Sequence, residues 1–113
     1  MQTIDKAMFE ELQSSAGADF VTELVGTFAE EAPPLLAELR AARAAADADG
    51  FRRAAHTLKS NGATFGAVEL QTLARALELA GLAADPAADE AAIDALQAAL
   101  NRAVTALQEL ARG

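Results

Sequence analysis

The sequence predicts an all-α protein, an antiparallel four-helix bundle with a short extra helix at its N-terminus. Two features of the composition support this prediction: 31 of the 113 residues are alanine, and the aromatic residues are five Phe with no Trp or Tyr. Alanine has the highest helix propensity, whereas aromatic and β-branched residues favour strands. In addition, apolar residues recur at steps of three and four, which is the helix period. A chain of this length is one domain in size, so we take residues 1–113 as a single domain.

The first predicted helix is short and spans residues 4–14. Asp5 is placed as its N-cap, and Ile4 precedes the cap at the position from which a hydrophobic staple packs on Phe9. Gly17 ends the segment.

The second predicted helix starts at Asp19, a good N-cap residue. The positions expected to face the core are Phe20, Leu24, Phe28, Leu35, Leu39 and Ala42. Pro33 and Pro34 each remove a backbone donor, and the second disfavours helical backbone at the first. Because the apolar stripe keeps its phase across this pair, we expect the helix to kink there and continue.

The third predicted helix follows a capped turn at residues 47–50. Its core positions are Phe51, Ala55, Leu58, Gly62 and Phe65. Glycine inside a helix costs about 0.5–1 kcal/mol relative to alanine, so Gly62 on this seam indicates close contact with a neighbouring helix. Gly66 is expected to break or bend the chain.

Two more amphipathic segments complete the predicted bundle. The first ends at Gly81, and its apolar positions are Ala67, Leu70, Leu73, Leu77 and Ala80. The second begins at Asp85-Pro86, a cap followed by proline at the first helical position. Its apolar positions are Ile93, Leu96, Leu100, Ala103, Leu107 and Leu110. Short turns between four such helices are typical of an antiparallel bundle.

The charge balance disfavours nucleic acid as a ligand. The net charge is −8, and no Lys/Arg cluster overrides it locally. No apolar run approaches the length of a membrane span, and residues 1–10 lack a basic segment followed by an apolar run. Acidic polar faces also argue against spreading on anionic lipid. We therefore expect a cytoplasmic protein with no membrane partner, although the absence of Cys leaves the compartment formally open.

His56 is the only histidine and the strongest candidate for chemistry. The seam residues Ala55 and Leu58 face inward, which turns His56 about 100° away from the core. Lys59, three residues on, lies on the same exposed strip, so its ammonium can reach an anion attached to the ring. Ser60 is small and leaves the ring accessible to another protein.

Two other types of site fit His56 poorly. A Ser-His-Asp hydrolase needs a cleft, and a convex helix offers none. Metal sites in bundles use Glu-x-x-His, whereas the residue three before His56 is Arg53, so we expect no metal. An exposed imidazole beside a positive charge suits reversible covalent capture of a phosphoryl group.

The segment from Ala55 to Ala67 resembles the signature of histidine-containing phosphotransfer (HPt) domains. That family's pattern is His-x-Leu-Lys-Gly with a second Gly ten residues after the His, inside a four-helix bundle of about this length. This chain matches it at His56, Leu58, Lys59 and Gly66 and departs from it at Ser60, where the family usually has Gly. The resemblance extends over essentially the whole chain.

The resemblance implies a phosphorelay intermediate that takes a phosphoryl group from the aspartyl phosphate of one receiver domain and passes it to another. His56 would be the acceptor, and Lys59 would neutralise the phosphoryl charge. Ser60 departs from the family's Gly, but serine is the next smallest polar residue, and its hydroxyl is able to hydrogen-bond a phosphoryl oxygen. Glu78 stands where family members place a Glu or Gln that binds the other ring nitrogen. The partners would be response-regulator receivers and a hybrid sensor histidine kinase, with Mg²⁺ held by the receiver and no cofactor on this chain.

The docking patch expected around His56 consists of Arg52, Thr57, Lys59, Ser60 and Ala63, with neighbours from residues 67–78 and the first helix. Such a protein is a phosphocarrier with no kinase activity of its own. The alternative function that the sequence leaves open is a non-phosphorylated helical adaptor that binds a receiver or a partner helix through the same face.

Overall fold

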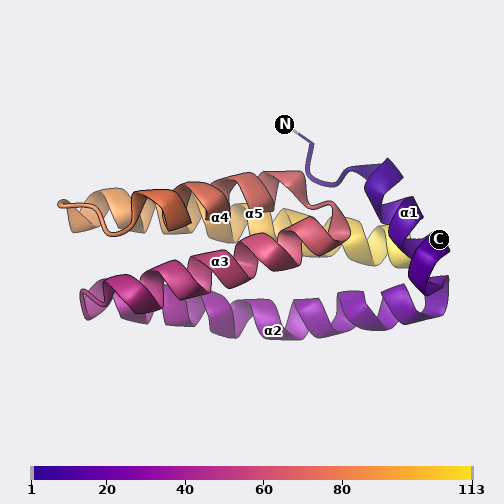
Figure 1. Cartoon of the computed structure of the whole chain (residues 1–113), viewed down its shortest axis with the longest axis horizontal. Helices are drawn as coiled ribbons and strands as arrows, with labels where there is room; N and C mark the ends of the chain where they lie inside the picture. The colour runs from indigo at the N-terminus through magenta and orange to yellow at the C-terminus, as the bar shows by residue number, and fades with distance from the viewer. Residues whose placement is uncertain (1, 113) are drawn as a thin grey trace.

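The computed structural model describes residues 2–112, so Met1 and Gly113, the ends of the predicted domain, lie outside the described residues. Within this range the chain forms five helices and no strand (Figure 1). The helices are α1 (Lys6–Ala16), α2 (Ala18–Ala44), α3 (Ala48–Phe65), α4 (Val68–Ala80) and α5 (Pro86–Arg112). The predicted all-α class is confirmed.

Helices α2, α3, α4 and α5 pack side by side along the long axis of the molecule, and α1 crosses one end of it (Figure 1). α3 contacts α2 and α4, and α5 contacts the same two helices. Within this group of four helices, each helix therefore has two neighbours. α1 packs on α2 and α3 at the end where α2 begins and α5 finishes. One cluster of buried Ala, Leu, Val, Ile and Phe side chains holds this arrangement together.

Helix α1 starts two residues later than predicted, at Lys6. The predicted cap is confirmed, because Asp5 Oδ1 accepts hydrogen bonds from the amides of Ala7 at 3.1 Å and Met8 at 3.3 Å. Ile4 and Phe9 both lie in the buried core. This end of the fold is therefore set by local sequence.

The predicted N-cap of α2 is wrong, because it lies two residues too late. The N-cap is Gly17 and not Asp19, which lies in the first helical turn. Gly17 N donates to Gln13 O, and Gly17 O accepts from Val21 N, so one residue closes α1 and opens α2. Gly17 adopts φ 97°, a left-handed conformation that favours glycine, and this lets the two helices abut without a linker.

Helix α2 continues through Pro33 and Pro34, as the phase of its apolar positions predicted. The predicted stripe itself is partly wrong. Phe20 is 52% exposed, and Leu24 and Leu35 are only half-buried. The buried positions are Val21, Val25, Phe28, Ala32, Leu36, Leu39 and Ala42. Two adjacent apolar strips run along this helix, and its packing on α3 and α5 decides which one is covered.

Helix α3 confirms the predicted seam, since Phe51, Ala55, Leu58, Gly62 and Phe65 are all buried. Residues 48–50, predicted as part of a turn, form its first helical turn. Asp47 is the cap, and its Oδ1 accepts from Gly50 N at 3.0 Å. Gly66 ends the helix with φ 71°, as a left-handed C-cap.

Helices α4 and α5 follow their predicted patterns with three exceptions. In α4, Leu73 is half-buried and Ala80 is exposed, while Ala74 is buried in their stead. In α5, Leu110 is only half-buried. The predicted start of α5 is confirmed: Pro86 is its first residue, and Asp85 Oδ1 accepts from Ala87 N at 3.0 Å. No helix in residues 2–112 combines the length and apolar character needed to cross a membrane.

Candidate functional site

Helix α3 presents His56 at the surface. Its neighbours Ala55 and Leu58 are fully buried, and the helical rotation between them turns the imidazole outward. The His56 side chain is 59% exposed. The ring is therefore accessible to a partner molecule.

The ring is held from one side by Glu78 of α4. His56 Nδ1 forms a short hydrogen bond with Glu78 Oε2. A carboxylate only accepts hydrogen bonds, so Nδ1 carries the proton and donates it. In the neutral ring, Nε2 then holds a lone pair, and no hydrogen bond to Nε2 is present among residues 2–112. This arrangement leaves one nucleophilic nitrogen on the exposed part of the ring.

Lys59 contacts the same carboxylate. Its Nζ donates to Glu78 Oε1 at 2.6 Å, so each oxygen of Glu78 has its own partner. The Glu78 side chain is only 15% exposed and that of Lys59 25%. Helical spacing predicted that the Lys59 ammonium can reach an anion attached to the ring, whereas in this structure the ammonium binds Glu78.

The hydrogen bond from Lys59 is the main cause that lowers the pKa of Glu78 below its usual value of 4.5. Burial opposes this shift, and the hydrogen bond from His56 adds to it. Glu78 is therefore an anion at neutral pH, which is the form that accepts a hydrogen bond from Nδ1.

Close packing of α3 on α4 brings these three side chains together. A Cβ atom on Gly62 would lie 3.3 Å from Ala67 O and from Gln71 N, which is tighter than ordinary packing. The connection between the helices is also short, with Ala67 N donating to Gly62 O at 2.8 Å. Gly62 therefore sets the spacing across which Glu78 reaches His56 and Lys59.

The remaining predicted docking residues are spread around the ring. Ser60 is exposed, and its carbonyl accepts from Thr64 Oγ1 at 3.1 Å. Arg52 forms an ion pair with Asp49. Ala63 is half-buried. All of these lie on α3, and among residues 2–112 no hydrogen bond joins their side chains to the His56 ring.

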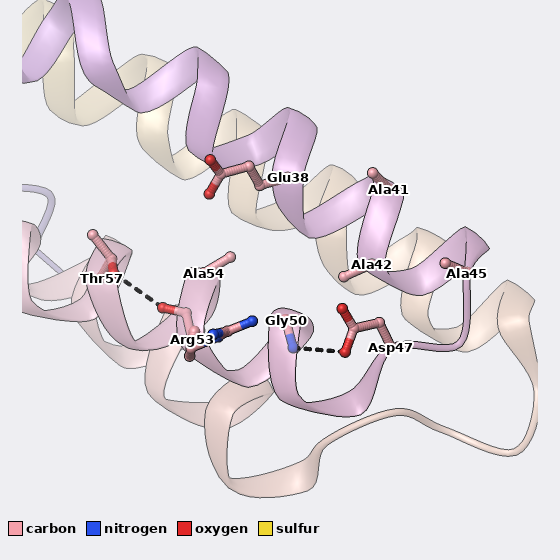
Figure 2. Close-up of a pocket in the computed structure, with 9 residues that line it drawn as sticks. All are labelled: Glu38, Ala41, Ala42, Ala45, Asp47, Gly50, Arg53, Ala54 and Thr57. Atoms are coloured by element: carbon pink, nitrogen blue, oxygen red, sulfur yellow. Dashed lines mark hydrogen bonds between the residues drawn. The ribbon is translucent and has the colours of Figure 1, made fainter.

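Thr57 faces a different feature, a groove between α2 and α3 of about 610 Å³ (Figure 2). Its hydroxyl donates to Arg53 O at 3.0 Å. The groove is lined by Glu38, Ala41, Ala42, Ala45, Asp47, Gly50, Arg53, Ala54 and Thr57. His56 is not among these residues, so this groove is separate from the imidazole site.

Residues 2–112 contain no group of three His, Cys, Asp or Glu side chains arranged to hold a metal ion. The expected absence of a metal cofactor stays a prediction. Within the His56 site, the local charges are one carboxylate and one ammonium in contact with each other.

The sequence patterns missed the Lys59–Glu78 contact. The two residues are 19 positions apart on different helices, and neither helical periodicity nor the family signature pairs them. The sequence gives one indirect signal of this contact. Lys59 has no acidic residue three or four positions away on its own helix, so an acidic partner has to come from another helix.

Comparison with known proteins bears on what this site does. Neither the curated proteins nor the solved structures gave a match. The family model described as "Hpt domain" matches residues 23–110. The matched region contains His56, Lys59 and Glu78 and covers most of the chain. The chain therefore belongs to the Hpt domain family.

Proposed function

We propose that this protein is a phosphorelay intermediate in which His56 carries the phosphoryl group. It would accept the group from the aspartyl phosphate of one receiver domain and pass it to the receiver of another response regulator. The observation that carries the proposal is the hydrogen bond between His56 Nδ1 and Glu78, which leaves the Nε2 lone pair exposed. Membership of the Hpt domain family supports a role in histidine phosphotransfer.

The transfer needs one bond made and one broken. The Nε2 lone pair attacks the phosphorus of the acyl phosphate, the bond from phosphorus to the aspartyl oxygen breaks, and the carboxylate leaves with the electron pair. Phosphorylated His56 keeps the proton on Nδ1, so the ring becomes cationic. Glu78 stabilises this charge because its carboxylate already faces Nδ1. Attack by the carboxylate of a second receiver reverses the step.

Lys59 and Ser60 have supporting roles in this proposal. The Lys59 ammonium keeps Glu78 anionic and adds positive charge beside the transferred phosphoryl group. The Ser60 hydroxyl, one turn beyond His56, donates to a phosphoryl oxygen. The receiver supplies Mg²⁺, and this chain holds no metal or other cofactor during transfer.

The same proposal covers the localisation of the protein, its donor, its docking patch and the arrangement of its helices. It is a cytoplasmic phosphocarrier without kinase activity of its own, and its initial donor is a hybrid sensor histidine kinase. Its docking patch is formed by Arg52, Thr57, Lys59, Ser60 and Ala63. The four long helices form an antiparallel bundle, which the pairwise helix contacts and the reversals of chain direction in Figure 1 support.

The proposal is tested by following label from a receiver domain phosphorylated with ³²P-acetyl phosphate. Wild-type protein is expected to gain acid-labile, base-stable label, and His56→Gln none. Arg112→Gln, in the last turn of α5, is the control for a change of an exposed side chain.

Equal labelling of wild type and His56→Gln would place the phosphoryl group on another residue. If a broad set of receivers binds wild type but none transfers label, the adaptor function is supported and the relay is rejected.

A further inference from the structure

Arg75 lies next to the His56 site on helix α4. It is exposed, and it precedes Glu78 by three residues. Side chains three apart on a helix are surface neighbours, with Cβ atoms about 5–6 Å apart. Arg75 therefore lies one helical turn from the residue that contacts the His56 ring.

The guanidinium of Arg75 forms no ion pair within residues 2–112 of the structure. The one acidic residue three or four positions from it is Glu78, and both oxygens of Glu78 are already bound by His56 and Lys59. The other residues at these spacings are uncharged: Gln71, Thr72 and Leu79. Glu78 therefore has His56 and Lys59 as its partners, and it forms no ion pair with Arg75.

Four other arginines of the fold contact a carboxylate of the chain: Arg40, Arg43, Arg52 and Arg102. Arg53 and Arg112 resemble Arg75, because they form no ion pair within residues 2–112 either. Arg53 lines the groove between α2 and α3 with Glu38 and Asp47 (Figure 2), and Arg112 lies in the last turn of α5. Arg75 differs from both in lying on α4, three residues from the carboxylate that binds His56.

The register of α3 against α4 places Arg75 beside an uncharged stretch. Gly62 packs against Gln71 at one point, and Lys59 reaches Glu78 at another. Arg75 falls between these two contacts, so it lies across from residues 59–62 of α3, where no residue is acidic.

We propose that Arg75 is a docking residue that pairs with a carboxylate at the rim of the receiver's acidic active centre. The inference rests on the proposed function, since it names the contact made when a receiver brings its aspartyl phosphate to His56. A standard protein interface covers about 800 Å² on each partner, so a receiver centred on His56 also covers Arg75. For a chain of net charge −8, an unbalanced cation at this point favours approach of an acidic partner.

The test is receiver binding measured by calorimetry in the His56→Gln background, which removes phosphoryl transfer from the readout. The probes are receiver domains from the same organism, activated with beryllium fluoride. Arg75→Gln is expected to weaken binding about threefold and Arg75→Glu about tenfold at low salt, because charges at an interface rim contribute modestly. The dependence of Kd on salt should decrease in both variants.

The matched controls are Arg112→Gln and Arg112→Glu, which change the net charge equally on an exposed residue of α5. Binding by the Arg112 variants should equal that of the parent, and circular dichroism checks that every variant is folded. If the Arg75 and Arg112 variants bind equally well, or if no receiver binds the parent, the inference is wrong.

Label transfer to the wild-type chain shows whether the docking role of Arg75 fails alone or the proposed relay function fails with it. If Arg75→Glu does not change the rate of transfer at limiting protein concentration, the docking role of Arg75 is wrong, but the relay function of His56 still holds. Receiver binding that depends on Arg75 without transfer to His56 keeps the docking contact and rejects the relay.

Discussion

At the scale of single residues, Glu78 links the two other members of the site. One oxygen accepts from His56 Nδ1 and the other from Lys59 Nζ. The carboxylate thereby selects the ring tautomer and is itself kept anionic by the ammonium. A change at Glu78 should therefore alter the ring directly, and a change at Lys59 should alter it through Glu78.

Replacing Glu78 by Ala removes the acceptor for the Nδ1 proton. The neutral ring should then populate the tautomer with the proton on Nε2, and phosphoryl transfer should fall by about 10- to 100-fold, as is typical for loss of a carboxylate that orients a functional histidine at a metal site. Nitrogen-15 chemical shifts of the His56 ring report the tautomer. Glu78→Gln, whose amide oxygen still accepts, is the control and should retain more transfer. An unchanged tautomer in Glu78→Ala would show that the carboxylate does not position the ring.

The lowered pKa of Glu78 predicts how its stabilising effect depends on pH. A carboxyl whose pKa is lower in the folded state than in the unfolded chain stabilises the fold above the unfolded value, here 4.5, and loses this effect as the pH falls through the folded value. The difference in Tm between wild type and Glu78→Gln should therefore shrink as the pH falls below about 4.5. Thermal unfolding followed by circular dichroism at acidic pH measures it. A difference that grows as the pH falls below 4.5 contradicts the assignment.

The site residues differ in how far sequence reveals them. His56 and Lys59 are one turn apart, so helical spacing alone places them on one strip. Glu78 was predicted only by resemblance to a family, because its approach to His56 depends on how α4 packs on α3. The Lys59–Glu78 contact was not predicted at all, since it joins residues whose proximity exists only in the fold.

At the scale of helices, the spacing of α3 and α4 depends on Gly62. A methyl group there would press on backbone atoms of Ala67 and Gln71, which have little freedom to move. Gly62→Ala should therefore destabilise the protein by about 1–3 kcal/mol, despite the better helix propensity of alanine. Urea unfolding measures this change, and transfer to His56 should fall as Glu78 is displaced.

Gly26 offers a control for that prediction. It lies on the exposed side of α2, and a Cβ atom there would have no neighbour within 4 Å. Gly26→Ala should stabilise the fold by about 0.5–1 kcal/mol through helix propensity alone. If both substitutions stabilise, α3 and α4 are not held at the spacing described.

The helices show which structural features depend on nearby residues and which depend on packing against other helices. The caps Asp5 and Asp85 were predictable because each binds amides within three residues of itself. The buried strip of α2 was not, since Phe20 and Val21 are both apolar and only the neighbouring helices determine that Val21 is covered. The exposed Phe20 shows that hydrophobicity alone does not assign a residue to the core.

At the scale of the whole molecule, Arg43 and Asp89 join three segments. Arg43 Nη1 donates to Asp89 Oδ2 at 2.7 Å and to Ala83 O at 3.1 Å. Asp89 Oδ2 also accepts from Ala83 N at 2.9 Å. The end of α2, the connection after α4 and the first turn of α5 are thereby tied together. Sequence periodicity did not predict this pair. An acidic residue in the first turn of a helix is common, and nothing in the sequence links Asp89 to Arg43.

Asp89→Ala should destabilise the fold by about 3 kcal/mol, since it leaves the largely buried Arg43 without a partner. The control is Glu90→Ala, which removes an exposed partner of Arg40 and should cost less than about 1 kcal/mol. Urea unfolding of both variants gives the comparison. If both variants lose the same free energy of unfolding, burial of the Arg43–Asp89 pair does not increase its contribution to stability.

The most direct measurement is the position of the phosphoryl group on the protein after incubation with a phosphorylated receiver. Phosphorus-31 NMR of protein labelled with nitrogen-15 in its single histidine identifies the nitrogen bonded to phosphorus. Because Glu78 holds Nδ1, the phosphoryl group should be on Nε2 of His56. A phosphoryl group on Nδ1, or on any residue other than His56, contradicts the account.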